Sequence, residues 1–231
     1  MVRNVAIAVP AIAAAFALGL LARALVDDGA DAQMRKTDVA AADTPEIRGL
    51  VLPVSEALEP FALVDDTGHA FGREALAGGW SFLYFGYTYC PDICPLTLVE
   101  LASLKRLLDE RCEGLDARYY LVSVDPDRDT PKRLHDYVRY FDASFRGVTG
   151  ETAEIDKLVS QVGAFYELPE DRSGNAYLVG HSSTVTLVDP DGKLHAIMTM
   201  PHTGEQMARD FAVMHERYRE RHHGYEPACA A

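Results

Sequence analysis

The chain has 231 residues, of which 48% are hydrophobic and 25% are charged, a composition typical of a globular protein with one domain of moderate size. Its formal net charge of -13 argues against nucleic acid or an anionic membrane surface as a partner and favours metal ions or cationic proteins. Four cysteines in a chain of this length exclude a fold that depends on a disulfide framework, so each cysteine needs its own explanation.

The first segment, Val5 to Ala22, is almost wholly apolar and follows Arg3. A helix of roughly 18 residues would be about 27 Å long, which is marginal but sufficient to span a bilayer. Positive charge at its amino end predicts that this end faces the cytoplasm and that the rest of the chain lies outside it. We therefore expect a membrane anchor over residues 1–25. A cleaved signal peptide is the alternative, and both would export the domain.

A tether and a folded domain are expected after the anchor. Residues 26–54 are rich in Ala, Asp and Gly without a sustained period, which is typical of a flexible linker. The folded domain is expected over residues 55–224 and begins with two short strands, Phe61 to Val64 and His69 to Phe71, on either side of a turn signal. A mobile tail over residues 225–231 is expected to end the chain.

The most informative stretch of the chain runs from a predicted buried strand into a loop with two cysteines. The strand, Phe82 to Phe85, is apolar and aromatic, and it breaks at Gly86 into the loop that contains Cys90 and Cys94, each followed by proline. A thiolate is both a nucleophile and a metal ligand. Two cysteines four positions apart across a turn are close enough to bind one ion or to close a disulfide. The spacing fits either chemistry.

A helix is predicted immediately after this loop, over residues 96–108, because leucines recur there every three or four positions. Pro95 suits the first helical position, where a missing N–H costs nothing, and this makes Cys94 the predicted N-cap. The positive end of the helix dipole would then lower the pKa of the Cys94 thiol.

The rest of the domain alternates between strands and helices. The order of elements predicts an α/β thioredoxin-like fold with an N-terminal β-hairpin extension and an inserted hairpin, preceded by one transmembrane anchor helix. The later elements are expected at residues 117–124 (strand), 132–141 (helix), 145–149 (strand), 152–165 (helix), 177–188 and 193–198 (hairpin) and 203–221 (helix).

Two further residues are candidates for the site. Asp125 ends a predicted central strand, at the edge where functional residues of open α/β sheets gather, but it could equally form the turn that follows. His181 begins a predicted strand, where its ring can reach outward, although most such histidines serve the structure alone. Met198, Met200 and His202 alternate like a soft-metal stripe, but a period of two is more typical of core packing.

The remaining cysteines and the late histidines are not expected to take part in chemistry. Cys112 is predicted to be a small buried residue at the end of a helix, and Cys229 lies in the tail without an assigned role. The histidines near the end of the last helix, His215, His222 and His223, are predicted to lie on a solvated face.

Three motifs, in this order after one anchor segment, resemble the Sco/SenC family. They are Cys90-Pro-Asp-Ile-Cys94-Pro95, Val124-Asp-Pro-Asp-Arg-Asp-Thr-Pro131 and His181-Ser-Ser, and the resemblance covers about residues 55–220. Members of that family are membrane-anchored, thioredoxin-fold copper proteins that act in assembling the dinuclear copper site of cytochrome c oxidase. The resemblance implies Cys90, Cys94 and His181 as ligands of Cu(I) or Cu(II), with Asp125 in a supporting role.

The implied activity is that of a metallochaperone rather than an enzyme. It would deliver copper to the copper-bearing subunit of cytochrome c oxidase, on the extracytoplasmic side of the membrane, and could exchange copper with other periplasmic carriers. Two thiolates and one imidazole form a soft set of few ligands that suits Cu(I), in agreement with this implication.

Two enzymatic alternatives remain. A thiol–disulfide oxidoreductase would use the Cys90/Cys94 pair to keep the oxidase subunit's cysteines reduced, although three intervening residues instead of two weaken this interpretation. A thiol peroxidase ranks third, because Tyr87 stands where that chemistry needs Thr or Ser.

Overall fold

The structure is a computed structural model that describes residues 47–229 except residues 173 and 175. The anchor expected over residues 1–25 and the first part of the expected tether, residues 26–46, lie outside the described residues. In the described part of the chain, no helix combines the length and the apolar character that crossing a bilayer requires.

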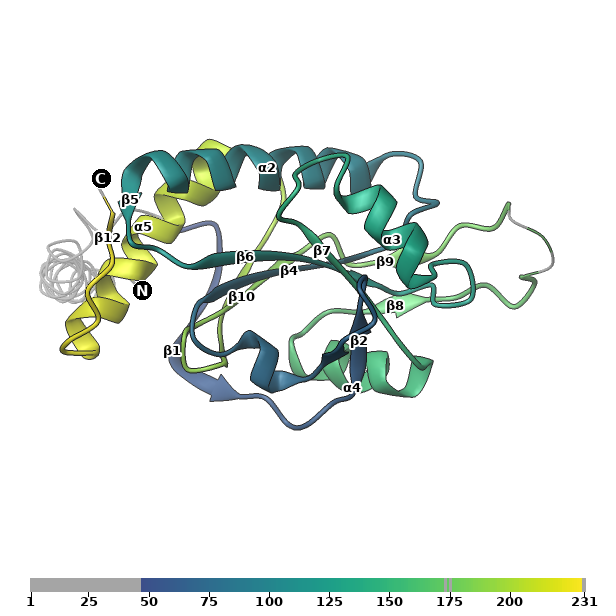
Figure 1. Ribbon diagram of the computed structural model, residues 1–231, viewed down its shortest axis with the longest axis horizontal. Coiled ribbons are helices and arrows are strands. Elements are labelled where there is room, and N and C mark those ends of the chain that lie inside the picture. The colour runs from purple at the N-terminus through teal and green to yellow at the C-terminus, as the bar shows by residue number, and fades with distance from the viewer. Residues whose placement is uncertain (1–46, 173, 175, 230–231) are drawn as a thin grey trace, which may run out of the picture. The chain divides into compact units, whose positions relative to one another are not determined.

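An eight-stranded mixed sheet forms the centre of the domain, with the strand order β1-β11-β10-β4-β6-β7-β2-β3 (Figure 1). The three strands β4, β6 and β7 run parallel, and β10 pairs antiparallel with both β4 and β11. The strands of this sheet are β1 (Gly49–Ala57), β2 (Leu63–Asp65), β3 (Ala70–Phe71), β4 (Trp80–Gly86), β6 (Ala117–Ser123), β7 (Arg146–Thr149), β10 (Val185–Val188) and β11 (Lys193–Met198).

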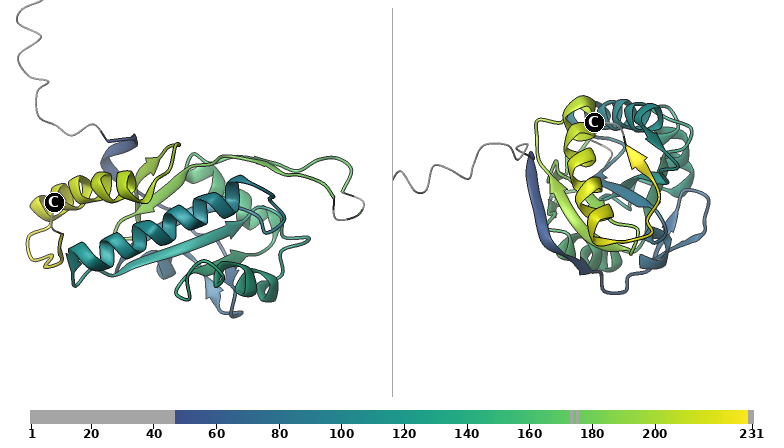
Figure 2. Two further views of the ribbon diagram at one scale, coloured as in Figure 1. Left: turned by 90° about the horizontal axis from the view of Figure 1, so that it is seen from above. Right: turned by 90° about the vertical axis from the view of Figure 1, so that its left-hand side faces the viewer.

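Helices cover both faces of the sheet. Figure 2 shows α2 and α5 side by side, and in Figure 1 they lie on the face opposite α4. Two short ladders lie outside the main sheet, where β5 pairs with β12 and β8 pairs with β9. This layered arrangement confirms the predicted α/β class. The remaining elements are η1 (Arg73–Leu76), α2 (Ile93–Arg111), β5 (Cys112–Glu113), α3 (Pro131–Val138), α4 (Thr152–Gln161), β8 (Tyr166–Glu167), β9 (Gly180–His181), α5 (Gly204–Arg221) and β12 (Ala228–Cys229).

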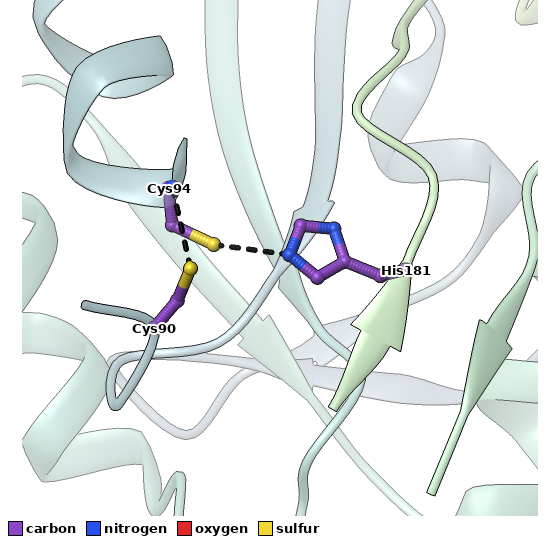
Figure 3. A group of neighbouring side chains, drawn as sticks. All are labelled: Cys90, Cys94 and His181. Atoms are coloured by element: carbon purple, nitrogen blue, oxygen red, sulfur yellow. Dashed lines mark hydrogen bonds between the residues drawn. The ribbon is translucent and has the colours of Figure 1, made fainter. Parts of the chain in front are cut away.

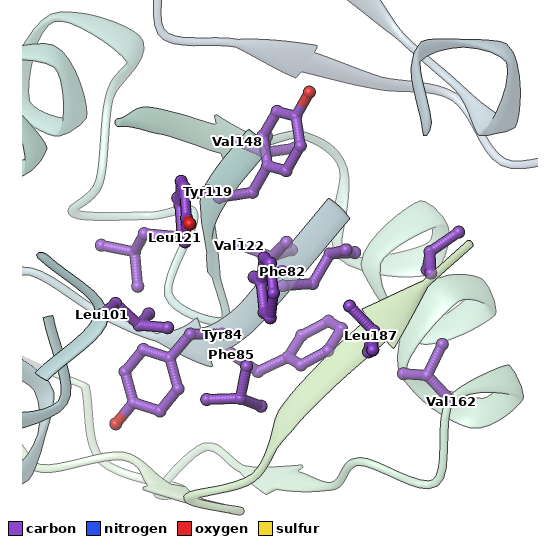
Figure 4. Close-up of a cluster of buried hydrophobic side chains, with 14 of the residues drawn as sticks. Phe82, Tyr84, Phe85, Leu101, Tyr119, Leu121, Val122, Val148, Val162 and Leu187 are labelled. Carbon is purple, nitrogen blue, oxygen red and sulfur yellow. The ribbon is translucent and has the colours of Figure 1, made fainter. Parts of the chain in front are cut away.

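The core lies between the central strands and the covering helices (Figure 4). Every residue of β4 is buried, as expected for a strand covered on both faces, and the Phe82 ring stacks on the Tyr119 ring of β6 at 5.1 Å. The leucines that predicted α2, among them Leu101 and Leu104, are fully buried. This packing fixes the carboxyl end of β4 and the amino end of α2, which is where the cysteine loop lies.

The folded domain is larger at both ends than the sequence suggested. Strand β1 begins at Gly49, inside the expected tether, and pairs antiparallel with β11. At the other end, Cys229 forms a disulfide with Cys112, and β12 pairs with β5, so the tail is tied down as far as Cys229. Both expectations were wrong for the same reason, because a strand pairing and a disulfide join segments that are distant in the sequence.

His215 also differs from its prediction. Its side chain is 1% exposed and packs among the rings of Trp80, Phe211 and Tyr225 instead of facing solvent. Burial lowers the pKa of His215 to about 4, because the charged imidazolium would lose its hydration there. We conclude that His215 belongs to the packing between α5 and the sheet.

Candidate metal centre

Cys90, Cys94 and His181 converge at the carboxyl end of the parallel strands (Figure 3). Cys90 lies in the loop after β4, Cys94 in the first turn of α2, and His181 in β9. One potential ligand atom from each side chain lies within 4.8 Å of the other two. Both cysteines are free thiols. The structure therefore brings together the three side chains that the sequence singled out.

Gly86 allows the cysteine loop to fold back against the end of β4. It pairs with Ser123 of β6, and a Cβ added at Gly86 would lie 2.8 Å from the Cys94 sulfur and 3.1 Å from the Tyr84 ring. This Cβ would also lie 3.3 Å from the Leu121 side chain, a tight but less severe contact. The Cys94 thiol occupies the space that a side chain at Gly86 would otherwise fill.

The position of Cys94 in the helix corrects one prediction. Helix α2 begins at Ile93 with Asp92 as its N-cap, so Cys94 lies inside the first turn and is not the cap. Pro95 remains compatible with this start, since the N–H groups of the whole first turn lack helical partners.

The two thiols also titrate differently from the prediction. The interaction with Cys90, together with complete burial, raises the pKa of Cys94, whereas the Cys94 thiol lowers the pKa of Cys90 to about 3. The backbone N–H of Cys94 additionally donates to the Cys90 sulfur at 3.5 Å. Helix-terminal stabilisation therefore acts on Cys90, and Cys94 retains its proton.

The imidazole of His181 is held in one tautomer. Its Nδ1 lies 3.0 Å from the carbonyl oxygen of Ser182, which can only accept, so Nδ1 carries the proton. Nε2 then carries a lone pair, which accepts a hydrogen bond from the Cys94 thiol at 3.4 Å and would be available to a metal once that proton leaves. The rings of Tyr84 and Tyr87 meet the imidazole edge-on, at 6.1 and 5.7 Å between centroids. A histidine that binds a metal usually has its second nitrogen bonded in this way.

Asp125 does not touch the three side chains of this group. Its buried carboxylate forms an ion pair with Arg128 and accepts a hydrogen bond from the Tyr177 hydroxyl at 2.7 Å. Asp125 also forms the expected turn, because its carbonyl oxygen accepts from the N–H groups of Arg128 and Asp129 at 3.2 and 3.0 Å. Tyr177 belongs to the segment that leads to His181, and the supporting role of Asp125 stays a prediction.

The methionine stripe does not join the centre. Met198 is buried in the core, Met200 is 52% exposed, and His202 donates from Nε2 to the Ser183 carbonyl at 2.5 Å. Packing thus accounts for Met198, as predicted.

Sequence reasoning missed the residues that arrange the ligands. The Ser182 carbonyl, the two tyrosine rings and the space at Gly86 all act on Cys94 or His181. The sequence offered only weak signals for them: a glycine at the end of an aromatic strand, and the alternation of Tyr87 and Tyr89 just before Cys90.

The chemistry of this group follows from its donor set. Two sulfurs and one neutral imidazole form a soft site of three ligands, which suits Cu(I). A closed structural zinc site usually takes four protein ligands. Among residues 47–229, as far as they are described, no fourth Cys, His, Asp or Glu belongs to the group. The fold and the site together define an α/β protein with an open, soft metal-binding centre.

Comparison with known proteins agrees with this class. The family model described as SCO1/SenC matches residues 53–216, and the chain belongs to this family. A Stutzerimonas stutzeri protein named for copper binding is 39% identical over 153 residues, which cover 66% of this chain and 74% of that protein. The mitochondrial SCO1 homolog 1 of Arabidopsis thaliana is 38% identical over 132 residues, which cover 57% of this chain but 39% of that protein.

Solved structures show the same relationship. The crystal structure of Arabidopsis thaliana ScoI with copper bound aligns with a TM-score of 0.63 and 34% identity, covering 69% of this chain and 98% of that chain. BsSco is a member of the Sco family of cytochrome c oxidase assembly proteins in which a disulfide switch is described. It aligns with a TM-score of 0.55 and 25% identity, covering 71% of this chain and 96% of the BsSco chain. The thioredoxin-like fold predicted from the order of elements is therefore confirmed for the described domain.

Proposed function

We propose that this protein binds copper through Cys90, Cys94 and His181 and carries it to cytochrome c oxidase during assembly. The observation that carries the proposal is the convergence of the three ligand atoms within 4.8 Å. The fixed tautomer of His181 adds to it, because the imidazole presents a lone pair to the sulfurs. Copper is the cargo in this function and leaves by exchange of ligands with the recipient.

The chain's own residues equip it for such an exchange. Cys90 is 9% exposed and lies in the loop, whereas Cys94 is fully buried beneath it. The thiolate of Cys90 is the donor that an incoming ligand of the recipient would reach first. With three protein ligands, a position stays open for that ligand while the others still hold the ion.

The recipient and the location are further parts of the proposal. Family membership and the similarity to BsSco, a member of the Sco family of cytochrome c oxidase assembly proteins, support the copper-bearing subunit of cytochrome c oxidase as the recipient. The Cys112–Cys229 disulfide supports an oxidising compartment outside the cytoplasm, such as the periplasm or the intermembrane space. The apolar segment near the amino end would anchor the chain there.

Copper binding by purified, reduced protein tests the proposal. Wild type should bind one equivalent of Cu(I), and His181→Ala should weaken binding while leaving the reduction potential of the Cys90/Cys94 pair nearly unchanged. His223→Ala, which alters an exposed histidine, is the matched control and should bind like wild type. In cells, His181→Ala should fail to restore oxidase assembly. Equal rescue by His181→Ala and by wild type would contradict the carrier function.

The unequal thiols favour a second candidate, a thiol–disulfide oxidoreductase. The Cys90 thiolate would attack a disulfide of the oxidase subunit, which forms a mixed disulfide and releases the first subunit thiol. Cys94 would then attack the Cys90 sulfur and release the second subunit thiol, leaving a Cys90–Cys94 disulfide. The lowered pKa of Cys90 suits the first step. The second step needs the Cys94 thiolate, and the main cause that raises the pKa of Cys94, its interaction with the Cys90 sulfur, changes once Cys90 is bonded to the subunit. His181→Ala separates the functions, because it removes a copper ligand but leaves both thiols, so a reductase would still reduce disulfides in the absence of metal.

A further inference from the structure

Arg128 joins the cysteine loop to the segment that carries His181. Its guanidinium carbon lies 3.4 Å above the centre of the Tyr177 ring, 4.6 Å from that of Tyr89 and 5.6 Å from that of Tyr87. The Arg128 side chain is only 6% exposed, and its charge is balanced by the buried carboxylate of Asp125. A desolvated cation over several aromatic faces is a strong attachment. Arg128 thus holds rings from both segments.

Hydrogen bonds of Arg128, Asp125 and Tyr87 also hold the segment that carries His181. Arg128 Nη1 donates to the Tyr177 carbonyl at 3.1 Å, and the Tyr177 hydroxyl donates to Asp125 at 2.7 Å. On the other side, the backbone N–H of Val179 donates to the Tyr87 hydroxyl at 3.1 Å. Val179 lies two residues before His181, so this bond ties the ligand's own segment to the residue three positions before Cys90.

The Tyr87 ring also limits how the imidazole can turn. It meets His181 edge-on at an interplanar angle of 88°, and Tyr84 meets the same ring at 77°. Strand β9, which carries His181, has only two residues and pairs with the equally short β8, so its ladder provides little support. The position of His181 therefore depends on side-chain contacts more than on the main sheet.

We propose that Arg128, Tyr87 and Tyr177 form a clasp that holds Nε2 of His181 close enough to the Cys94 sulfur for both atoms to bind one metal ion. All three are therefore positioning residues of the metal centre. This inference rests on the proposed copper site and extends it beyond the ligands themselves. The clasp preorganises the centre, because it keeps together the segments after β4 and before β9 whether or not a metal is bound.

A double-mutant cycle on the full-length protein tests the clasp. Arg128→Lys and Tyr87→Phe are each made in wild type and in His181→Ala, and Cu(I) affinity is measured by competition with a chromogenic chelator. Each change should weaken binding about tenfold in wild type, the effect of about one lost hydrogen bond to a charged or well-placed group. Each should weaken it less than twofold in His181→Ala, because no imidazole is left to position.

Arg133→Lys is the matched control. Arg133 also stacks on Tyr89, at 3.9 Å, and donates to Thr88, but these contacts stay on the cysteine-loop side. This variant should bind Cu(I) within twofold of wild type. Equal weakening by Arg128→Lys in both backgrounds, or wild-type affinity in Tyr87→Phe, would overturn the clasp.

A measurement without metal separates this inference from the proposed function. In the reduced apoprotein, Tyr87→Phe should speed amide hydrogen exchange at Val179 about tenfold, since the hydroxyl that accepts this N–H is gone. Unchanged exchange at Val179 would refute the clasp even if wild type binds copper. A wild type that binds no copper would refute the proposed function, while the exchange result still decides the clasp.

Discussion

Replacing Gly86 by alanine tests whether the fit between β4 and the cysteine loop sets the metal centre. The new methyl group would lie 2.8 Å from the Cys94 sulfur, about 1 Å inside the roughly 3.8 Å of ordinary contact. The sulfur would have to move by a comparable amount, whereas metal–ligand distances tolerate about 0.2 Å. We expect Cu(I) affinity to fall at least tenfold, or about 1.4 kcal/mol.

The same substitution should also cost stability, about 1–3 kcal/mol, because it overpacks a buried site. Gly150→Ala is the matched control, since its methyl group would lie 2.7 Å from Leu63 in the core beside β7, away from the thiols. Chemical denaturation should show losses of similar size in both variants. A chelator competition titration should show weaker copper binding in Gly86→Ala alone.

Two outcomes would refute this reasoning. Wild-type copper affinity in Gly86→Ala would mean that the Cys94 thiol has room to move without leaving the site. Equal loss of affinity in Gly150→Ala would mean that general destabilisation, and not the position of the sulfur, weakens binding.

Two other features make independent predictions. The pKa of His215 is lowered from 6.5 in the unfolded chain to about 4 in the folded protein. Between these pH values the unfolded chain binds a proton that the folded protein does not bind. Stability that is present above pH 6.5 is therefore lost as the pH falls, by up to about 3 kcal/mol at pH 4. His215→Leu should remove this share of the pH dependence in denaturation curves measured from pH 4 to 7, and an unchanged slope would contradict it. Cys229→Ser opens a disulfide that spans 117 residues of sequence and should reduce the free energy of unfolding by about 2–5 kcal/mol without changing Cu(I) affinity. Weaker copper binding in this variant would show that the far end of α2 influences the centre.

Local patterns predicted the central fold well. The aromatic run of β4 and the leucine period of α2 are signals within one segment, and the helix predicted over residues 132–141 corresponds to α3, where Thr130 is the N-cap and accepts from the Arg133 N–H. Pro95 marked the first turn of α2 but not the position within it, because proline is tolerated anywhere that the backbone N–H has no helical partner.

Features that depend on distant contacts could not be predicted. The pKa of Cys94 follows from its burial and its neighbour Cys90, which outweigh the helix terminus that the sequence revealed. The edge strand β1 depends on β11, and the disulfide of Cys112 depends on the tail. For His181, the order of motifs indicated a role, but its approach to the sulfurs depends on contacts with Tyr87 and Ser182 that no local pattern encodes.

Helix α2 begins beside two free thiols and is followed at once by a cysteine in a disulfide. Its 19 residues place the two ends of the helix about 28 Å apart. All four cysteines of the sequence are thereby divided into one permanent cross-link and one exchangeable pair. Because Cys94 is fully buried in the native chain, an alkylating reagent added during denaturation without a reductant will count the state of the exchangeable pair: two labels when it is reduced, none when it is oxidised.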